Sequence, residues 1–386
     1  MRSLLGHPVN AKERLLGKIA LNSPWFFCGR NSVIVTSSPN RKSLRHMAVL
    51  TDINDIDDYL KSGDNTIYYG VSNIKELNAG DIVRLTPEGK IDVLYEIESQ
   101  HNVLFVTEQC NCSCLMCPQY TTRNKTDYTE EILALIRLIP QKTRSLGITG
   151  GEPTLLGDNL FRILESCKQI LPKTALHLLS NGIKFEDFEF AKKFALIGHP
   201  DIQIGIPLYA DTDTEHNYIV QANGFYKTLK GIQNLALFKQ RVEIRVVITA
   251  LNYQRLPKLA EFIYRNFPFV IHIAFMGMET KELAMKNLNE VWIDPYEYQS
   301  YLSEAVEFLS LRQMNVSIYN HQLCVLPKIL WPYSRKSIST WKNIYLEECQ
   351  KCICREICGG LFDSSKIIHS VHIKALSNEN IDKQII

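Results

Sequence analysis

The stretch "NVLFVTEQCNCSCLMCPQ", residues 102–119, joins a short apolar run to four cysteines that lie within eight positions. The run 102–108 has the length and composition of a buried β-strand. Cys110, Cys114 and Cys117 follow it with C-x3-C-x2-C spacing, and Cys112 lies between them. The sequence therefore predicts a strand that ends at a cysteine-rich loop.

Downstream of this stretch, short apolar runs alternate with longer helical patterns, and the runs are apolar throughout, as is typical of parallel strands buried on both faces. This alternation predicts an α/β fold with a parallel sheet, open or rolled into part of a barrel. Functional residues are then expected at the C-terminal ends of the strands. We expect six strands, "HNVLFVTE" (101–108), "SLGITG" (145–150), "ALHLLSNG" (175–182), "IQIGIPLY" (202–209), "EIRVVITALN" (243–252) and "VIHIAFMG" (270–277), and helices that begin near Thr129, Asn159 and Phe225.

Three domains are expected along the chain. Residues 1–100 contain the hairpin pattern "GDIVRLTPEGKIDVLYEI" (80–97) and are predicted to form a small β-rich or α+β domain. Residues 101–312 hold the alternating strands and helices, with a last helix near 296–311. Residues 313–386 form a C-terminal extension with the strand "NVSIY" and a second group of cysteines.

Composition excludes several classes of protein. The chain has 386 residues, is 45% hydrophobic and 22% charged, and has a net charge of +2, as globular proteins do. Without a long basic run we expect neither nucleic acid nor an anionic membrane as a partner. The most apolar stretch, 267–278, is too short for a membrane span, contains His272 and is predicted to be a buried strand.

The eleven cysteines indicate metal binding. Four lie at 110–117 and four at 349–358, with Cys28, Cys167 and Cys324 elsewhere. The N-terminus has charges where a signal peptide needs an apolar stretch, so a cytoplasmic location is predicted. Thiols stay reduced in that compartment, and clustered thiols there point to a metal or to catalysis.

The spacing of the first cysteines favours an iron–sulfur cluster over zinc. A [4Fe–4S] cubane is normally held by four thiolates, so three local thiolates leave one iron with an open site. Zinc stays an alternative, because 114/117 and 349/352 are both C-x2-C pairs. The gap between these pairs far exceeds the roughly 15–20 residues of a compact zinc ribbon.

The segment "GITGGEPTLLG", residues 147–157, follows the second predicted strand. One interpretation is a glycine-rich turn before a helix. The other is a ligand site, in which Gly150 and Gly151 expose backbone carbonyls, Glu152 adds an acceptor and Pro153 stiffens the exit. Such a site would accept hydrogen bonds from an amino group.

These two motifs, in this order and on matching strands, resemble those of the radical S-adenosylmethionine (SAM) superfamily. The resemblance implies a partial (β/α)6 barrel of the TIM type and a [4Fe–4S] cluster whose open iron binds SAM, which is cleaved reductively to a 5′-deoxyadenosyl radical. It implies SAM contacts for the four residues of the Gly-Gly-Glu-Pro segment. Looser matches add Ser180, Asn181, Arg245 and Asn252, for which the alternative is a hydrogen-bonding role at the strand ends. Cys112 is then the superfluous thiol, directed away from the others.

The second cysteine group gives Cys349, Cys352 and Cys358 in C-x2-C-x5-C spacing, with Cys324 upstream. This quartet would fully ligate a second, auxiliary [4Fe–4S] cluster, and Cys354 could replace one member. A four-cysteine zinc knuckle is the structural alternative. The pattern resembles the SPASM and Twitch extensions that follow the barrel in peptide-modifying radical SAM enzymes.

A closer resemblance is to the His-Xaa-Ser system radical SAM maturases. It is carried by "IPLYADTDTEHNYIVQANGFYKTLKGI" (206–232), "NVSIYNHQLCVLP" (315–327), "SISTWKN" (337–343) and the terminal cysteines. It implies a ribosomally made precursor peptide as substrate, a second radical SAM maturase as partner, and a reductant such as flavodoxin or ferredoxin. Tyr209 and His216 would line the pocket, and residues 1–100 would be a candidate peptide-docking surface.

Two alternatives remain open. The first is a radical SAM enzyme that acts on a small molecule or nucleotide. The second is a non-catalytic iron–sulfur or zinc protein that serves as a scaffold or electron carrier.

Overall fold

The computed structural model describes residues 2–21, 31–37, 39, 47–56, 64–336 and 343–378. Cys28 and residues 337–342 of the stretch "SISTWKN" lie outside these ranges. The chain divides into two compact units: Met1–Leu104 with Tyr128–Gly147 and Arg162–Thr174, and Phe105–Asp127 with Ile148–Phe161 and Ala175–Ile386. Among the described helices, none has the length and apolar character needed to span a bilayer.

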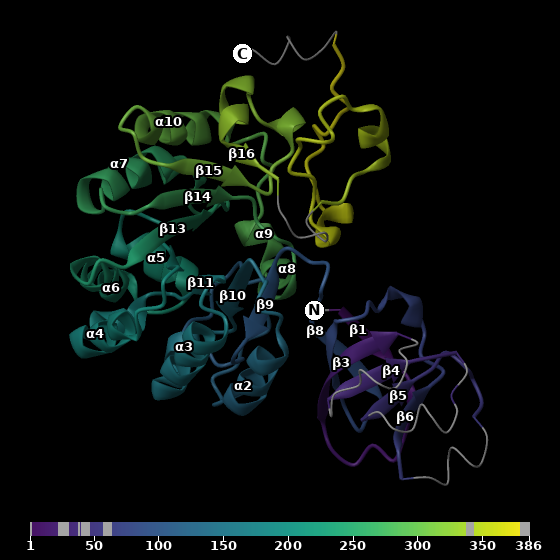
Figure 1. Ribbon diagram of the computed structural model, residues 1–386. Coiled ribbons are helices and arrows are strands. Elements are labelled where there is room, and N and C mark those ends of the chain that lie inside the picture. The colour runs from purple at the N-terminus through teal and green to yellow at the C-terminus, as the bar shows by residue number, and fades with distance from the viewer. Residues whose placement is uncertain are drawn as a thin grey trace. The chain divides into compact units, whose positions relative to one another are not determined.

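The N-terminal unit is built on an eight-stranded sheet, ordered β1-β8-β7-β3-β4-β5-β6-β2 (Figure 1). The predicted hairpin is confirmed, because β7 and β8 pair antiparallel around a turn where Gly89 adopts φ +91°. Side chains such as Leu50, Tyr68 and Val83 form the core of the unit. The strands are β1 (Arg2–Leu5), β2 (His7–Val9), β3 (Leu15–Leu21), β4 (Ser32–Val35), β5 (Ala48–Leu50), β6 (Thr66–Tyr69), β7 (Ile82–Leu85) and β8 (Lys90–Tyr95).

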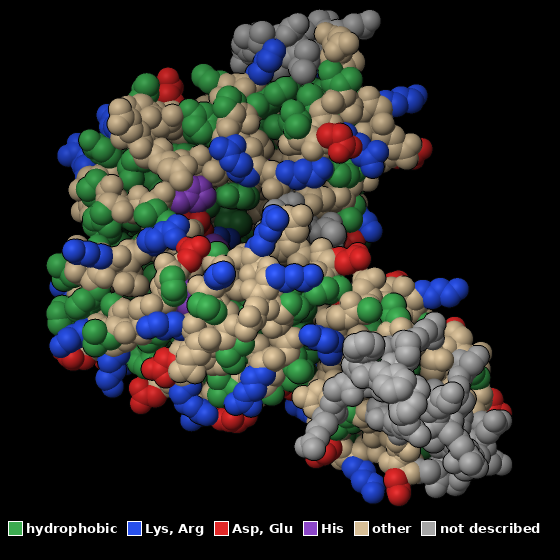
Figure 2. Space-filling view, viewed as in Figure 1, with side chains coloured by type: hydrophobic (Ala, Val, Ile, Leu, Met, Phe, Trp, Pro, Cys, Tyr) green, Lys and Arg blue, Asp and Glu red, His purple; other side chains and the backbone are tan. Residues whose placement is uncertain are grey.

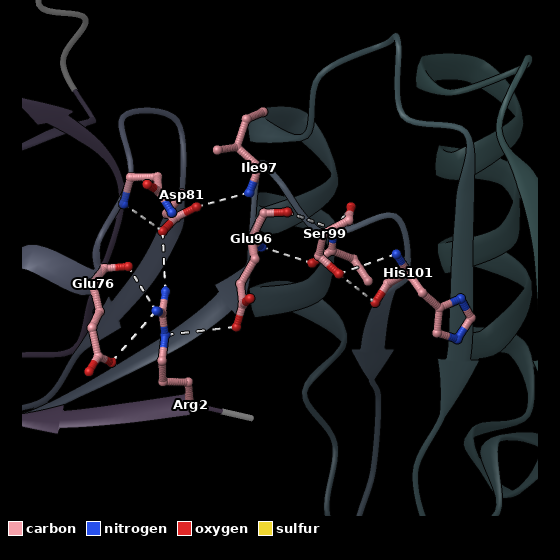
Figure 3. Close-up of polar contacts among 9 residues, drawn as sticks. Arg2, Glu76, Asp81, Glu96, Ile97, Ser99 and His101 are labelled. Carbon is pink, nitrogen blue, oxygen red and sulfur yellow. Dashed lines mark hydrogen bonds and ion pairs between the residues drawn. The ribbon is translucent and has the colours of Figure 1, made fainter. Parts of the chain in front are cut away.

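A buried aspartate organises the end of this sheet (Figure 3). Asp81 is fully buried and accepts hydrogen bonds from the backbone N–H groups of Asn78 (2.9 Å) and Ile97 (2.8 Å). The Arg2 guanidinium lies 3.4 Å from the same carboxylate and donates to the Glu76 carbonyl oxygen at 2.8 Å. The carboxylate therefore joins the first strand to the segment that leaves β8.

We expect Asp81→Ala to lower the free energy of unfolding of this unit by about 2–4 kcal/mol. The substitution leaves two partly buried N–H groups without an acceptor, and each such loss costs about 1–3 kcal/mol. Hydrogen–deuterium exchange of residues 76–97 in the full chain measures the change. Glu76→Ala is the control, because that half-exposed carboxylate lies 3.8 Å from Arg2 and such pairs contribute about 0–1 kcal/mol. Equal losses in the two variants would contradict the role of Asp81.

The second sheet has the order β16-β15-β14-β13-β12-β11-β10-β9, and the pairs from β11 to β16 are parallel (Figure 1). All six predicted strands are present in this partial barrel. The strands are β9 (Asn102–Phe105), β10 (Ser145–Thr149), β11 (Ala175–Leu179), β12 (Ile202–Pro207), β13 (Arg241–Val247), β14 (His272–Met276), β15 (Val316–Tyr319) and β16 (Ser334–Arg335).

Two strands of the predicted C-terminal extension lengthen this sheet. β15 contains the expected strand "NVSIY", but it pairs in parallel with β14 and so continues the barrel sheet past residue 312. β16 pairs in turn with β15. The physical reason is that β14 would otherwise leave its backbone N–H and C=O groups unpaired at an exposed edge.

The predicted helices near Thr129, Asn159 and Phe225 are confirmed, and the last predicted helix is α10. Figure 1 shows α4, α6, α7 and α10 on one side of the barrel strands. The helices are α2 (Thr129–Leu138), α3 (Asp158–Ile170), α4 (Phe188–Ile197), α5 (Asp213–Val220), α6 (Phe225–Leu237), α7 (Leu256–Asn266), α8 (Glu282–Lys286), α9 (Leu288–Val291) and α10 (Gln299–Ser310).

The expectation that the strands are apolar on both faces is wrong. Ile204 and Ile244 are fully buried, but the neighbouring positions, Gln203, Glu243 and Arg245, are polar and point to the opposite face because side chains alternate along a strand. One face of the sheet therefore packs in the hydrophobic core, and the other carries polar groups. The two hydrophobic residues that flank each polar one hid this alternation in the sequence.

Candidate active site

The cysteine loop after β9 is held by backbone hydrogen bonds on several sides. The Cys110 N–H donates to the Thr122 carbonyl at 2.9 Å, and the Leu115 N–H donates to the Ile219 carbonyl at the end of α5 at 3.0 Å. At the far end of the loop, the Cys117 carbonyl accepts from the Leu283 N–H of α8 at 3.1 Å. Because its backbone is bonded at both ends and in the middle, the loop presents its thiols in a restricted geometry.

Cys112 lies among the other thiols of this loop. It is buried, whereas Cys110, Cys114 and Cys117 are partly exposed. Its hydrogen bond with Cys110 lowers the pKa of Cys112, but a hydrogen bond with Cys114 and burial raise it to about 12 overall. The expectation that Cys112 is directed away from the others is therefore wrong. Spacing alone does not set side-chain direction in a loop without regular backbone geometry.

The donor set of this loop fits an iron–sulfur cluster in its chemistry. The hydrogen bond with Cys112 and burial raise the pKa of Cys110 far above its ordinary value, and burial also raises the pKa of Cys117. Thiolates at such positions need positive charge nearby, which a metal centre supplies. Within the described residues, no group of three or more His, Cys, Asp or Glu side chains is arranged to hold a single metal ion.

The glycine pair after β10 lets two backbones touch. The Gly151 N–H donates to the Thr107 carbonyl at 2.8 Å, and the Glu152 N–H donates to the Gln109 carbonyl at 2.7 Å. A Cβ atom at Gly150 would lie 2.3 Å from the Thr107 oxygen, and one at Gly151 would lie 2.2 Å from the Gln109 oxygen. Only residues without a side chain fit here. The pair therefore fixes the chain just before Cys110.

Glu152 uses its carboxylate inside the protein. It is 1% exposed, and its Oε1 accepts from the Thr154 N–H and hydroxyl and from the Ser180 hydroxyl, at 3.0, 2.6 and 2.8 Å. Its Oε2 accepts from the Asn181 N–H at 2.6 Å. Burial raises the pKa of Glu152 although all these bonds lower it. The Glu152 side chain joins the ends of β10 and β11. It also caps the short 3-10 helix that begins at Pro153.

Asn181 connects the end of β11 to the cysteine loop. Its Nδ2 donates to Asn111 Oδ1 at 2.7 Å and lies 3.5 Å from the sulfur of Cys112. Ser180 is buried, and besides donating to Glu152 it accepts from the Gly182 N–H at 3.1 Å. These two predicted SAM contacts thus lie beside the thiols, and their cofactor role stays a prediction.

Asn252 and Arg245, the other predicted SAM contacts, occupy different environments. Asn252 is buried after β13, where its Nδ2 donates to the carbonyls of Tyr209 and Val247 at 3.0 Å each. Its Oδ1 accepts from the Thr249 N–H at 2.8 Å. Arg245 instead lies on the polar face of the sheet and pairs with Glu243 at 2.7 Å. Asn252 therefore braces the ends of β12 and β13, and Arg245 remains 23% exposed.

Tyr209 and His216, which were expected in the pocket, pack against each other. Their rings stack with centroids 5.8 Å apart, and both are nearly fully buried. The Tyr209 N–H donates to His216 Nδ1 at 3.3 Å, and burial lowers the pKa of His216 to about 4. Both residues support the wall beside the cysteine loop, since Tyr209 shares a hydrophobic cluster with Cys112 and Met116.

The C-terminal cysteines are brought together around one cavity. Its lining includes the whole predicted quartet and also Cys354, namely Cys324, Cys349, Cys352, Cys354 and Cys358, together with the basic residues Arg355 and Lys374. The Leu376 N–H lies 3.4 Å from the Cys352 sulfur. Burial raises the pKa of Cys324 to about 11, so its thiolate also needs a cationic partner. None of the ten described cysteines forms a disulfide.

Sequence reasoning missed two groups of polar residues. The first is the set Glu243, His177, His272 and Gln203 on the polar face of the barrel sheet; its only sequence signal is a single polar residue inside each apolar run. The second lines a cavity beyond the ends of β14 and β15 and includes Trp292, Tyr298, Asn320 and His369. Figure 2 shows a recess in the barrel with histidine, basic and acidic side chains at its edge.

We expect Gly151→Ala to loosen the cysteine loop and to cost about 1–3 kcal/mol of stability, because only a backbone shift can relieve the contact with Gln109. Faster alkylation of Cys110 by a thiol reagent, mapped by mass spectrometry, measures the loosening. Gly157→Ala is the matched control, since nothing lies within 4 Å of its Cβ and only its φ of +58° is strained. It should leave Cys110 alkylation unchanged, and equal acceleration in both variants would contradict the assignment.

Comparison with known proteins supports the architecture. Residues 104–263 match the family model described as the radical SAM superfamily. No curated protein sequence matches the chain. The structure of native anSMEcpe with bound AdoMet and Kp18Cys peptide has a TM-score of 0.51 to this chain at 16% identity, over 73% of this chain and 94% of that one.

Two further structures are more distant in shape. SuiB from Streptococcus suis, bound to precursor peptide SuiA, has a TM-score of 0.46 at 14% identity, over 57% of this chain and 48% of that one. A radical SAM methyltransferase from Sphaerobacter thermophilus has a TM-score of 0.40 at 14% identity, over 64% and 74% of the two chains. The chain thus spans about half the length of the SuiB structure.

The matched range begins in β9, contains the cysteine loop and the glycine pair, and ends in α7. Residues 104–263, which hold these features, thus match the radical SAM superfamily model.

Proposed function

We propose that the chain is a radical SAM peptide maturase in which Cys110, Cys114 and Cys117 hold a [4Fe–4S] cluster. The observation that carries the proposal is the restrained cysteine loop at the C-terminal end of β9, inside the range that matches the radical SAM model. When bound, the cluster and SAM together supply a 5′-deoxyadenosyl radical that abstracts a hydrogen atom from the substrate.

The residues of the chain hold and orient these groups. The three thiolates bind the cluster, and the glycine pair keeps their loop against the end of β10. Glu152 holds the ends of β10 and β11 together, so that Ser180 and Asn181 stay beside the loop. Tyr209 and His216 form an apolar wall that excludes water from a reactive intermediate.

We expect replacement of Cys110, Cys114 or Cys117 by Ala to abolish 5′-deoxyadenosine formation by anaerobically reconstituted protein. The fall in 5′-deoxyadenosine formation should exceed the roughly 10–100-fold effect that is typical of removing a residue that hydrogen-bonds to a metal ligand. Chromatography of the SAM cleavage products measures it. Cys112→Ala is the matched control, because it removes a thiol from the same loop and should keep activity. A variant of the three that retains activity, or a Cys112→Ala enzyme that has none, would refute this ligand set.

A precursor peptide is the proposed substrate. Two solved structures that resemble this chain were determined with peptides, SuiB with precursor peptide SuiA and anSMEcpe with the Kp18Cys peptide. The His-Xaa-Ser type, a second radical SAM maturase, a flavodoxin or ferredoxin as reductant, and a cytoplasmic location belong to this proposal. The cavity lined by Trp292, Tyr298 and His369 is a candidate place for the peptide, and residues 1–100 are a candidate docking surface.

The cavity lined by the C-terminal cysteines is proposed to hold an auxiliary [4Fe–4S] cluster. The support is that all four proposed ligands, Cys324, Cys349, Cys352 and Cys358, line one cavity and that burial raises the pKa of Cys324 to about 11. Cys354 lines the same cavity and is the alternative fourth ligand.

The iron content of single variants tests this second site. Ala at any of the four proposed positions should lower the iron content by up to about four atoms per chain, which is one cubane. Cys354→Ala should leave the content unchanged. Measured zinc in place of iron, or a loss of iron only in the Cys354→Ala variant, would contradict the proposed set.

A radical SAM enzyme that acts on a small molecule is the second candidate, because the recess in the barrel carries polar groups that suit a compact ligand. Anaerobic incubation with SAM, dithionite and a small His/Ser-rich peptide encoded alongside separates the two candidates. A mass change in the peptide supports the maturase. Formation of 5′-deoxyadenosine with an unchanged peptide favours a small-molecule substrate, and absence of 5′-deoxyadenosine favours the non-catalytic alternative.

A further inference from the structure

A buried carboxylate is the centre of the polar face of the barrel sheet. Glu243 on β13 has a side chain that is 6% exposed. Its Oε2 accepts from Gln203 Nε2 on β12 at 2.8 Å and lies 2.8 Å from His272 Nδ1 on β14. Its Oε1 accepts from Arg245 at 2.7 Å and lies 3.5 Å from His177 Nε2 on β11. Residues from four adjacent strands thus converge on one carboxyl group.

Glu243 stays ionised in this setting. Burial raises the pKa of Glu243, but the His177 ring 3.5 Å away, the hydrogen bond with His272 and the charge of Arg245 outweigh burial and hold the pKa far below its ordinary range. An ionised carboxylate accepts hydrogen bonds and donates none. Each ring nitrogen that faces it must therefore carry a hydrogen atom.

This requirement selects the tautomers of the two histidines. For His272 the facing atom is Nδ1, so in the neutral ring Nε2 holds the lone pair. For His177 the facing atom is Nε2, which is buried, lies 3.5 Å from Glu243 Oε1 and makes no hydrogen bond. A lone pair there would face the negative charge, so the hydrogen is expected on Nε2 and the lone pair on Nδ1. In a neutral imidazole one nitrogen donates and the other accepts. Both rings then turn a basic nitrogen away from the carboxylate.

A glycine makes room for this arrangement. Gly205 on β12 lies directly opposite Glu243 in the sheet. A Cβ atom there would lie 2.8 Å from His177 Nε2 and 2.9 Å from Arg245 Cδ. Any larger residue at this position would push the side chains of His177 and Arg245 apart. Glycine leaves the space above β12 that these two side chains occupy.

We propose that His177 and His272 form an acid–base centre in the barrel, with Glu243 as the positioning residue, that accepts a proton from an O–H or N–H group of the substrate. This rests on the proposed function. His177 is the more accessible of the two, with 28% of its side chain exposed against 11% for His272.

The proposed step balances without an oxidant. The substrate O–H or N–H bond breaks, its electron pair stays on the oxygen or nitrogen, and the proton moves to the lone pair of the imidazole. The imidazolium that forms faces the carboxylate of Glu243, which stabilises it as carboxylates do in acid–base dyads. The return of the proton to solvent or product restores the neutral ring.

Other polar groups on this face belong to the same centre. The rings of Tyr319 on β15 and His272 lie in a T-shaped arrangement with centroids 6.2 Å apart. Arg245 supplies a permanent positive charge beside Glu243. The titratable and charged groups that face the two histidines from the packed strands are Glu243 and Arg245 on β13, Tyr319 on β15 and, through Tyr319, Arg335 on β16.

The first test measures the tautomers directly. Nitrogen NMR of the full chain labelled with 15N-histidine, at a pH where imidazoles are neutral, should show Nδ1–H with a bare Nε2 for His272 and the reverse for His177. Spectra of His177→Gln and His272→Gln assign the signals. The opposite tautomer at either residue, or a mixture that Glu243→Gln leaves unchanged, overturns the proposal.

The second test separates proton transfer from radical generation. Reconstituted enzyme is incubated with SAM, dithionite and the His/Ser-rich peptide over a range of pH. We expect His177→Gln and His272→Gln to form 5′-deoxyadenosine within about 2-fold of the unmodified chain, but to lower peptide modification about 100-fold, within the range of general-base effects. His101→Gln, which replaces a histidine outside β11 to β14, is the matched control and should change neither.

The pH dependence distinguishes an acid–base role from a structural one. Modification by the unmodified chain should rise with pH, because only an unprotonated base can accept a proton, while the variants lose this dependence. Variants that lower 5′-deoxyadenosine and modification together, or that keep the pH dependence, overturn the acid–base centre. Absence of 5′-deoxyadenosine in the unmodified chain instead refutes the proposed function, and the tautomer measurement then decides whether Glu243 fixes the two rings.

Discussion

The structure depends on a close contact between two backbones. The segment before Cys110 and the glycine pair after β10 meet through main-chain hydrogen bonds, and this approach leaves no space for a Cβ atom. Hydrogen bonds between backbones are short and directional, so they position a loop more closely than side-chain packing does. The thiols of the loop are consequently placed by the geometry of the sheet, because both segments leave adjacent strands.

Glu152 extends this constraint to the next strand. A fully buried carboxylate is unfavourable unless its oxygens are hydrogen-bonded, and here four donors from two segments satisfy it. Glu152 was expected to accept hydrogen bonds from a ligand, but in the structure its carboxylate oxygens accept them from the protein. Ser180 and Asn181 are held beside the cysteine loop as a result. Asn181 therefore reaches the cysteine loop, and Glu152 holds its backbone in place.

The strands, the main helices and the N-terminal hairpin could be predicted because each rests on a local pattern: apolar runs, helical periodicity and a Pro-x-Gly turn. The direction of the Cys112 side chain could not be predicted, because side chains follow no repeating pattern along an irregular loop. The polar face of the barrel was also missed. A single Glu or His between apolar residues of one strand does not indicate a functional site. The convergence on Glu243 becomes visible only when four strands are placed in register. The place of β15 in the barrel sheet likewise depends on pairing between distant segments.

The two cysteine groups differ in a way that bears on their chemistry. The first is on a loop whose backbone is bonded to α5, α8 and the end of β10, and its partly exposed thiols adjoin polar side chains such as Asn181. The second lines a cavity that also has two basic residues in its lining. A centre that must receive a ligand needs an accessible corner, whereas one that only holds or relays charge is better surrounded, because burial and nearby cations set its potential. The sequence spacing gives three regular thiols in one place and more than four in the other, and these two sets lie in different surroundings.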